Sequence, residues 1–408
     1  MTTSHTLLTS KTAATVCGVI AGAILFLLVG WVLQDPFENL QTDWLAFDNA
    51  ADRLFAGEDI YRGIDVDDEP FPYLYPPFAL VLVLPLTLFG FIGSWAISAL
   101  LTASSFVGGL WLASRAMEVE GERATTMIIA LSTGTFMATV LIAQYSGIYV
   151  LSAGLALWLW SKDRRILAGL ALAILLMKPN IGLAVPFILV WSRSWRVLSG
   201  FAIGALASGA VSLIFGVSQW MGFISAVQEQ SQLQQGGTAP VEKMVTFVGG
   251  VQSLFGLGAA SPVVIGVWLC STFVVGVGTL RLWSPRRLRD DLPIAVGAFA
   301  IFVVVANPRL YFYDASLIVL GVFVLWHQRA RLGPRVQRLL PFLGLALWFA
   351  SWGTLISSLN ALVAPLGAVL VVLVAMDARS QELELRKDGQ VSRAKPVEPV
   401  ENSGARAA

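Results

Sequence analysis

Charged side chains are scarce in this 408-residue chain: 13% of the residues are Asp, Glu, Lys or Arg, while 56% are hydrophobic. Soluble domains carry roughly 25% charged residues, so a soluble protein of this composition could not cover its surface. The two cysteines, Cys17 and Cys270, each lie inside an apolar run, which argues against a disulfide framework. The only histidines are His5 and His327, and the sequence shows neither a metal-ligand cluster nor a nucleic-acid-binding signature. We therefore expect a membrane protein without a metal cofactor and without a nucleic-acid partner.

Long runs of apolar residues make up much of the sequence. Four of them, at residues 12–33, 197–215, 259–280 and 340–359, are each long enough for a membrane-spanning helix of about 20 residues. Backbone groups in lipid must be satisfied within their own segment, so these runs are expected to be helices. With the shorter apolar segments, the pattern predicts an all-α, polytopic transmembrane helix bundle of about twelve spans. The predicted spans are 12–33, 94–114, 124–143, 147–160, 166–177, 181–192, 197–216, 259–280, 292–306, 315–327, 338–358 and 360–376.

For two apolar segments, length alone does not say whether they span the membrane in the mature protein. No small-residue cleavage pattern follows Trp31, so the first run is expected to remain as an uncleaved span. Residues 78–91 are apolar but brief, and we expect them to lie along the interface or to dip into the membrane and return. A full span at 78–91 is the alternative.

The distribution of positive charge supports this map. Of the 27 Lys and Arg residues, 22 fall in the tail and in loops assigned to one side, and positive loops stay cytoplasmic. The other five are Arg53, Arg62, Lys178, Lys243 and Arg309. A full span at 78–91 would invert every later loop. We therefore expect a multi-pass protein of the inner (plasma) membrane with both termini cytoplasmic. Residues 1–376 form its membrane domain, and the polar segment 377–408 forms a disordered cytoplasmic tail.

The first outer loop, residues 34–76, is strongly acidic. It holds eleven of the 26 acidic residues, and most of them fit a solvated charge run, with 65–69 expected to be a flexible loop. Residues 43–57 differ, because aromatic and apolar side chains recur there at helical spacing, with Thr42 placed to cap the helix and Gly57 to end it. This pattern predicts an amphipathic helix at the membrane interface.

Several polar residues are candidates for chemistry on the same side. Asp43 lies in the first turn of the predicted helix, close to the lipid headgroups, where its carboxylate is placed to act as a base on a hydroxyl. Asp48 on the same helix is a candidate for substrate binding. Tyr75, in an extended segment fixed by two prolines, is either part of an interfacial aromatic belt or a sugar platform.

Three outward-facing turns add further candidates. Gln144 joins two spans, and Lys178 lies at membrane depth in a short hairpin, where a cation is a functional candidate with phosphate as its natural partner. A snorkelling lysine is the alternative. Arg309 and Asp314 flank an aromatic turn; the arginine is suited to bind a phosphate, and a structural Arg–Asp pair is the alternative. All these turns map to the side of the acidic loop.

The residues resemble those of glycosyltransferase family 87. The resemblance rests on Thr42-Asp43-Trp44-Leu45-Ala46-Phe47 and the chain through Arg53-Leu54-Phe55-Ala56-Gly57 to Tyr61, followed by Tyr75-Pro76-Pro77, Ala143-Gln144, Ala168-Gly169, Lys178-Pro179 and 307–314, over roughly residues 15–330. It implies a helical fold of the C-type (GT-C) membrane glycosyltransferases. It also places the family's catalytic aspartate on Asp43 and its lysine-proline turn on Lys178-Pro179. The sequence Ala143-Gln144-Tyr145-Ser146 departs from the commoner Gly-Gln-x-Asn pattern.

The resemblance implies inverting transfer of a sugar from a polyprenyl-phosphate donor to a glycolipid or glycan of the cell envelope, among membrane lipids and without a cofactor. Mannose is the first expectation, and arabinofuranose carried on decaprenyl phosphate is the second. A secondary transporter is the main alternative from a different class, since many-spanned proteins are often carriers. A non-catalytic scaffold or flippase subunit is a third. The oligomeric state is left open.

Overall fold

The computed structural model describes residues 12, 14–16, 18–23, 43–62, 65–66, 69–70, 73–119, 121–235, 241–354 and 359–394. Four of its helices are long and apolar enough to cross a membrane: α5 (Gly90–Ala116), α12 (Trp195–Ile214), α15 (Pro262–Leu282) and residues Asn360–Gln381 of α20. Helices α6 (Arg123–Leu131) and α7 (Gly134–Leu141) are bent by 61° and would make a fifth span together. The chain is therefore a helical membrane protein with four or five candidate spans among the described residues.

The predicted count of twelve spans is not confirmed, and the reason is helix length. The other predicted spans that the structure describes do contain helices, but these are shorter than the roughly 20 residues that an isolated span needs. They are α8 (Ser146–Ser161), α9 (Arg165–Ala173) with η3 (Ile174–Met177), α10 (Pro179–Gly182) with α11 (Ala184–Trp191), α17 (Leu292–Val305), η5 (Phe312–Ala315) with α18 (Ser316–His327), and α19 (Pro334–Ala350). Most of the first predicted span, including all of residues 24–33, lies outside the described residues.

The acidic loop contains more structure than a charge run. The predicted amphipathic helix is confirmed as α3 (Asp43–Ala56), although its expected cap, Thr42, lies outside the described residues. The predicted flexible loop at 65–69 is wrong in part, because β1 (Asp65–Val66) and β2 (Glu69–Pro70) pair antiparallel there. Backbone hydrogen bonds of a short hairpin hold a segment that side-chain charge alone would leave open. Residues 78–91 contain only η1 (Pro77–Ala79), α4 (Leu80–Val83), η2 (Thr87–Phe89) and the start of α5.

Several elements were not predicted from the sequence. The polar stretch after α12 forms α13 (Ser218–Gln235), followed by η4 (Val241–Lys243) and α14 (Phe247–Phe255). The remaining short elements are α16 (Arg287–Asp290), η6 (Arg329–Arg331) and η7 (Ser351–Thr354). Helix α20 (Asn360–Ala394) continues across residue 377, where the tail was predicted to begin.

Close backbone contact at glycine holds the central helices together. A Cβ added to Gly154 of α8 would collide with the carbonyl oxygen of Gly109 on α5, and one added to Gly109 would collide with the backbone of Val150. Small residues of this kind let two helices approach closely, which is the usual basis of packing in membranes, where burial of apolar surface contributes little. The pair α5–α8 therefore forms a rigid support under the turn that begins α8.

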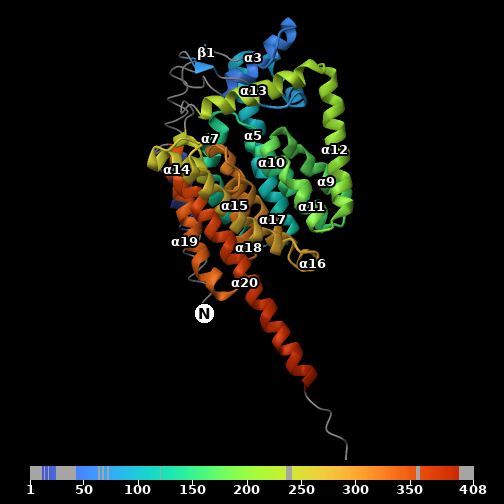
Figure 1. Cartoon of the computed structure of the whole chain (residues 1–408), viewed down its shortest axis with the longest axis vertical. Helices are drawn as coiled ribbons and strands as arrows, with labels where there is room; N and C mark the ends of the chain where they lie inside the picture. The colour runs from blue at the N-terminus through green and yellow to red at the C-terminus, as the bar shows by residue number, and fades with distance from the viewer. Residues whose placement is uncertain are drawn as a thin grey trace, which may run out of the picture.

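The two ends of the molecule differ in composition. Figure 1 shows α3, β1 and α13 at one end of the helical body, whereas α16 and the second half of α20 lie at the other. The arginine-rich α16 is thus far from the acidic α3, as the charge distribution predicted. The assignment of these ends to the cytoplasm and the outside remains a prediction from the charge distribution.

Candidate active site

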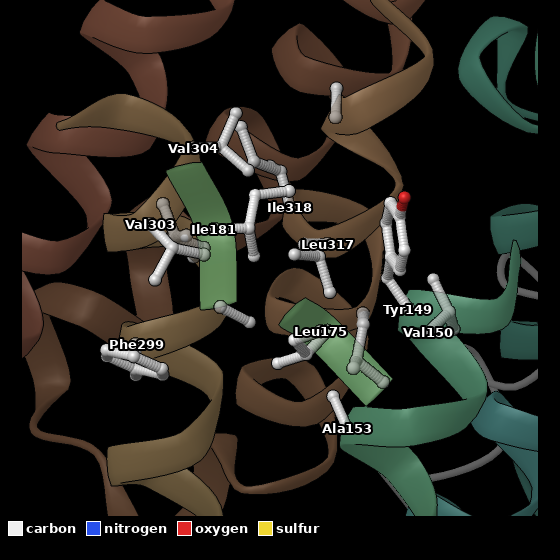
Figure 2. Packing of buried hydrophobic residues seen from close by; sticks show 14 of the residues in the cluster. Tyr149, Val150, Ala153, Leu175, Ile181, Phe299, Val303, Val304, Leu317 and Ile318 are labelled. Carbon is white, nitrogen blue, oxygen red and sulfur yellow. The ribbon is translucent and has the colours of Figure 1, made fainter. Parts of the chain in front are cut away.

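A broken helix presents Lys178 to the interior. The chain leaves η3 at Met177, and Lys178 adopts an extended conformation (φ −123°, ψ 90°) because the next residue is Pro179, which begins α10. On either side of the break, Leu175 and Ile181 are buried between α8 and helices α17 and α18, as Figure 2 shows. These two apolar anchors fix the direction in which the lysine side chain leaves the turn.

The partner of Lys178 is Asp314, at the turn before α18. The lysine Nζ lies 2.7 Å from Oδ1 and 2.5 Å from Oδ2 of this carboxylate, whose side chain is fully buried. The carboxylate also accepts hydrogen bonds from the Tyr311 backbone N–H (3.1 Å) and, more weakly, from the Ser146 hydroxyl (3.4 Å). The lysine ammonium lies 4.9 Å from the ring centroid of Tyr313. A buried charge needs such a set of partners, because removal from water costs several kcal/mol.

This arrangement corrects two interpretations of the sequence. The alternative of a structural pair between Arg309 and Asp314 is wrong, because Asp314 pairs with Lys178. The alternative of a snorkelling lysine also fails, since the Lys178 side chain is only 15% exposed and its ammonium is directed to a buried carboxylate.

Arg309 belongs to a polar network that ties its turn to the turn of Lys178. Asn307 accepts a hydrogen bond from the Arg309 backbone N–H (2.9 Å) and donates its own amide to the Asn180 carbonyl (2.8 Å). The Arg309 guanidinium donates to the Ser231 hydroxyl of α13 (2.9 Å), and partial burial lowers the pKa of Arg309, an effect that Tyr311 opposes. Two cationic side chains, Lys178 and Arg309, are therefore anchored at the two turns that Asn180 and Asn307 join.

An aromatic cluster lies under α3. The ring of Phe47 packs against Tyr73, Tyr75 and Tyr145, with centroid distances of 5.6, 5.0 and 4.9 Å. The hydroxyl of Tyr75 donates a 2.7 Å hydrogen bond to Gln144 Oε1, so the structure brings together two of the predicted substrate-binding residues. We call Phe47, Tyr73, Tyr75 and Tyr145 the aromatic cluster.

The turn that begins α8 connects the aromatic cluster to the ion pair. Three consecutive residues make the connection: Gln144 bonds Tyr75, Tyr145 packs on Phe47, and Ser146 bonds Asp314. The Thr102 hydroxyl of α5 fixes this turn by donating to the Gln144 carbonyl (2.9 Å). The aromatic cluster and the ion pair are thus bonded to neighbouring residues of a single turn.

The two acids of α3 are placed differently. Asp43 is the first residue of the helix, directly before Trp44, whose indole N–H donates to the Ser94 hydroxyl (2.9 Å) and ties the start of α3 to α5. The side chain of Asp43 lies outside the described residues. Asp48 takes no part in the hydrogen bonds of the ion pair or the aromatic cluster; partial burial, and secondly the charge of Asp52, raise the pKa of its carboxyl.

Sequence reasoning missed several members of this region. Ser146 was seen only as a polar residue of its turn, and its bond to Asp314 spans 168 positions of the chain. Ser231 was missed with the whole of α13, although the apolar spacing of Phe223 and Ala226 was a usable signal. Within the described part of the chain, no group of three or more His, Cys, Asp and Glu side chains is arranged to hold a metal ion.

Comparison with known proteins gives one match. The sequence model of glycosyltransferase family 87 matches residues 73–308, which is more than half of the chain and includes Tyr75, Gln144 and Lys178 but neither Asp43 nor Asp314. No curated protein and no solved structure matches. With its apolar spans and this match, the chain belongs to glycosyltransferase family 87 and is a membrane glycosyltransferase.

Proposed function

We propose that this protein transfers a sugar, mannose in the first instance, from a polyprenyl-phosphate donor to a glycolipid or polysaccharide of the cell envelope on the outer face of the membrane, with inversion. The observation that carries the proposal is the Gln144–Ser146 turn, which bonds Tyr75 of the aromatic cluster through Gln144 and Asp314, the partner of Lys178, through Ser146. Arg309 lies on the next turn, which Asn307 and Asn180 tie to the Lys178 turn. A phosphate needs cations, and a sugar needs aromatic faces and hydrogen-bonding groups. These linked turns offer both.

The donor phosphate would be held by Lys178 and Arg309. A guanidinium can bind phosphate with two parallel hydrogen bonds, and an ammonium acts as a compact point charge. In the structure, the Lys178 ammonium is paired with the Asp314 carboxylate. A donor phosphate would therefore share the ammonium with this carboxylate or displace it. Cationic groups at this position would also stabilise the phosphate as it leaves with the bonding electrons of the sugar.

The base is proposed to be Asp43. Inversion requires a base on the acceptor face, opposite the leaving phosphate, which takes the proton of the acceptor hydroxyl as its oxygen forms the new bond. Asp43 begins α3, and the aromatic face of this helix is packed on the cluster that contains Tyr75 and Tyr145. The position is fixed by Trp44, which is buried and bonded to Ser94.

Membranes containing the wild-type protein or Asp43→Asn, incubated with radiolabelled polyprenyl-phosphomannose, test the proposal. We expect labelled product from the wild type and a loss of at least about 100-fold in the variant, because general-base catalysis contributes on this scale. Equal expression and equal melting temperature of the two proteins are the controls. Normal transfer by Asp43→Asn would remove Asp43 from the mechanism, and failure with mannose but transfer from decaprenyl-phosphoarabinose would identify the second sugar.

One observation favours the transporter alternative. The break between η3 and α10 places an ion pair within an apolar body, as the interrupted helices of carriers do. Uptake of free sugar into proteoliposomes, measured beside transfer from a lipid donor, separates the two functions. We expect transfer without uptake.

A further inference from the structure

An apolar cavity of about 220 Å³ has Ala315, the residue after Asp314, in its wall. Its walls come from α6, α7, α18, α19 and the first turn of α20, and they are almost wholly hydrophobic. Helix α19 packs on α20 and on the turns that flank it, which leaves a space between α19 and the pair α6–α18. Its lining residues include Ala130, Thr135, Ala315, Val322, Trp326 and Gly344.

The cavity wall follows α18 from the turn that carries Asp314. One end is at Ala315, which follows Asp314 in η5, so this turn presents one residue to Lys178 and the next to the cavity. The wall then follows α18 as far as Trp326, eleven residues later, which is about 16 Å of helix. That is about half of the roughly 30 Å hydrocarbon core of a bilayer.

Polar atoms mark its ends and are rare between them. In the part of the chain that the structure describes, the hydroxyl of Thr135 and the indole N–H of Trp326 are buried without a hydrogen-bond partner. Thr135 lies at the active-site end, because its carbonyl accepts a hydrogen bond from Thr139, which also contacts the Tyr313 carbonyl and Ser316. The other hydroxyl-bearing residues of the wall, Thr126, Thr133 and Ser351, already donate to backbone carbonyls. A sugar would therefore find few partners along the walls, whereas a hydrocarbon chain fits their apolar surface.

We propose that this cavity holds one hydrocarbon chain of a phosphate-bearing lipid, with the phosphate end at Thr135 and the Lys178 turn. The placement of the phosphate at the Thr135 end, rather than at the Trp326 end, rests on the proposed function. The binding of a chain follows from the extent of the wall along α18, its apolar lining and its place between α19 and the pair α6–α18 of an apolar helical protein. The chain would anchor the lipid while its headgroup lies at the ion pair.

Gly344 of α19 offers a direct way to fill the cavity. A Cβ built on this glycine meets only a methyl carbon of Val322 at 3.9 Å, so a larger side chain would enter the space without a backbone collision. Gly266 on α15 is the matched control, because it is also helical and a Cβ there meets nothing within 4 Å. Ala130→Leu fills the cavity from α6 and serves as the second variant.

The test is binding to the purified full-length protein in detergent, with no sugar transfer involved. The probes are decaprenyl phosphate, dioleoyl phosphatidate and the short-chain geranyl phosphate. We expect Gly344→Leu and Ala130→Leu to weaken binding of a long-chain probe by at least about tenfold, since each excluded methylene loses its burial. Binding of geranyl phosphate should change less than about threefold, and Gly266→Leu should behave as the wild type.

The outcomes are distinguishable. Weakened decaprenyl phosphate binding alone identifies an isoprenoid chain, and weakened phosphatidate binding alone identifies an acyl chain; either supports the proposal. Unchanged binding of both long-chain probes in two folded variants overturns it. A wild-type protein that binds a chain but transfers no sugar would contradict the proposed function and leave the cavity assignment intact.

Discussion

Lys178 and Asp314, 136 positions apart in the chain, form an ion pair in which the carboxylate is fully buried and the ammonium nearly so. The pair closes η3 and α10 against η5, so it joins two of the turns that sequence reasoning had assigned to one side of the membrane. Buried pairs of this kind contribute little to stability relative to apolar residues, yet the loss of one partner leaves an uncompensated charge. The pair is therefore expected to have a role beyond stability, which the proposed phosphate contact supplies.

The first prediction concerns this pair. Lys178→Ala and Asp314→Ala should each lower the free energy of unfolding by about 3–5 kcal/mol, because each leaves a buried charge alone. The double variant should lose less than the sum of the two. Thermal unfolding in detergent measures all three proteins. Additive losses of unfolding free energy would show that the two side chains do not interact. Normal donor binding by the double variant would show that Lys178 does not bind the phosphate.

A second prediction separates two tyrosines of the aromatic cluster. Tyr75→Phe removes the donor to Gln144 Oε1 and leaves a buried amide oxygen with one partner fewer, which costs about 1–3 kcal/mol. Tyr73→Phe is the matched control, because the Tyr73 hydroxyl is buried without a hydrogen-bond partner among the described residues. We expect a lower melting temperature and at least about fivefold slower transfer for Tyr75→Phe only. Equal effects of the two variants would contradict the assignment of the hydrogen bond.

The third prediction tests the support beneath the site. Gly154→Val places two methyl groups and a Cβ against the Gly109 carbonyl, and the helices α5 and α8 must separate to admit them. We expect the free energy of unfolding to fall by at least about 3 kcal/mol, because the helices are overpacked. We also expect loss of transfer, because the separation of the helices displaces the Gln144–Ser146 turn. Gly209→Val on α12, where a Cβ meets nothing within 4 Å, is the control and should fold normally. The measurements are the yield of folded protein and its melting temperature.

Local sequence patterns predicted several helices correctly, and they failed where contacts between distant segments decide the structure. The apolar spacing of residues 43–57 gave α3, and long charge-free runs gave α5, α12 and α15, because helix formation in an apolar setting depends on the residues of the segment itself. The predicted number of spans was not confirmed, since a length rule for isolated helices does not apply to short helices that other helices surround. Helix α13 was missed because its polar side chains hid one buried position, Ala226, and two partly buried ones, Phe223 and Ser231, which packing determines.

The candidate site could be predicted only as a set of turns. Sequence reasoning singled out Tyr75, Gln144, Lys178, Arg309 and Asp314, and the structure brings Tyr75 to Gln144 and Lys178 to Asp314. The pairing itself was not predictable, because Arg309 and Lys178 are equally good partners for a carboxylate on charge alone. The choice depends on the Pro179 turn and on the bond between Arg309 and Ser231, which involve segments far apart in the chain.

The last prediction concerns Asp48 and pH. Partial burial and the charge of Asp52 raise the pKa of this carboxyl in the folded protein, so its ionised form opposes folding. That cost is fully present above the folded-state pKa and disappears as the pH falls below the unfolded-state value of 3.8, where the carboxyl is protonated in both states. Asp48→Asn should therefore raise the melting temperature at pH 7 by about 1–2 °C, a small gain because solvent screens a half-exposed group. The gain in melting temperature should vanish when the pH falls below the unfolded-state pKa of 3.8. Glu58→Gln, an exposed acid just beyond α3, controls for the change in net charge, and a gain for Asp48→Asn that persists unchanged in acid would show that the variant acts through packing rather than through ionisation.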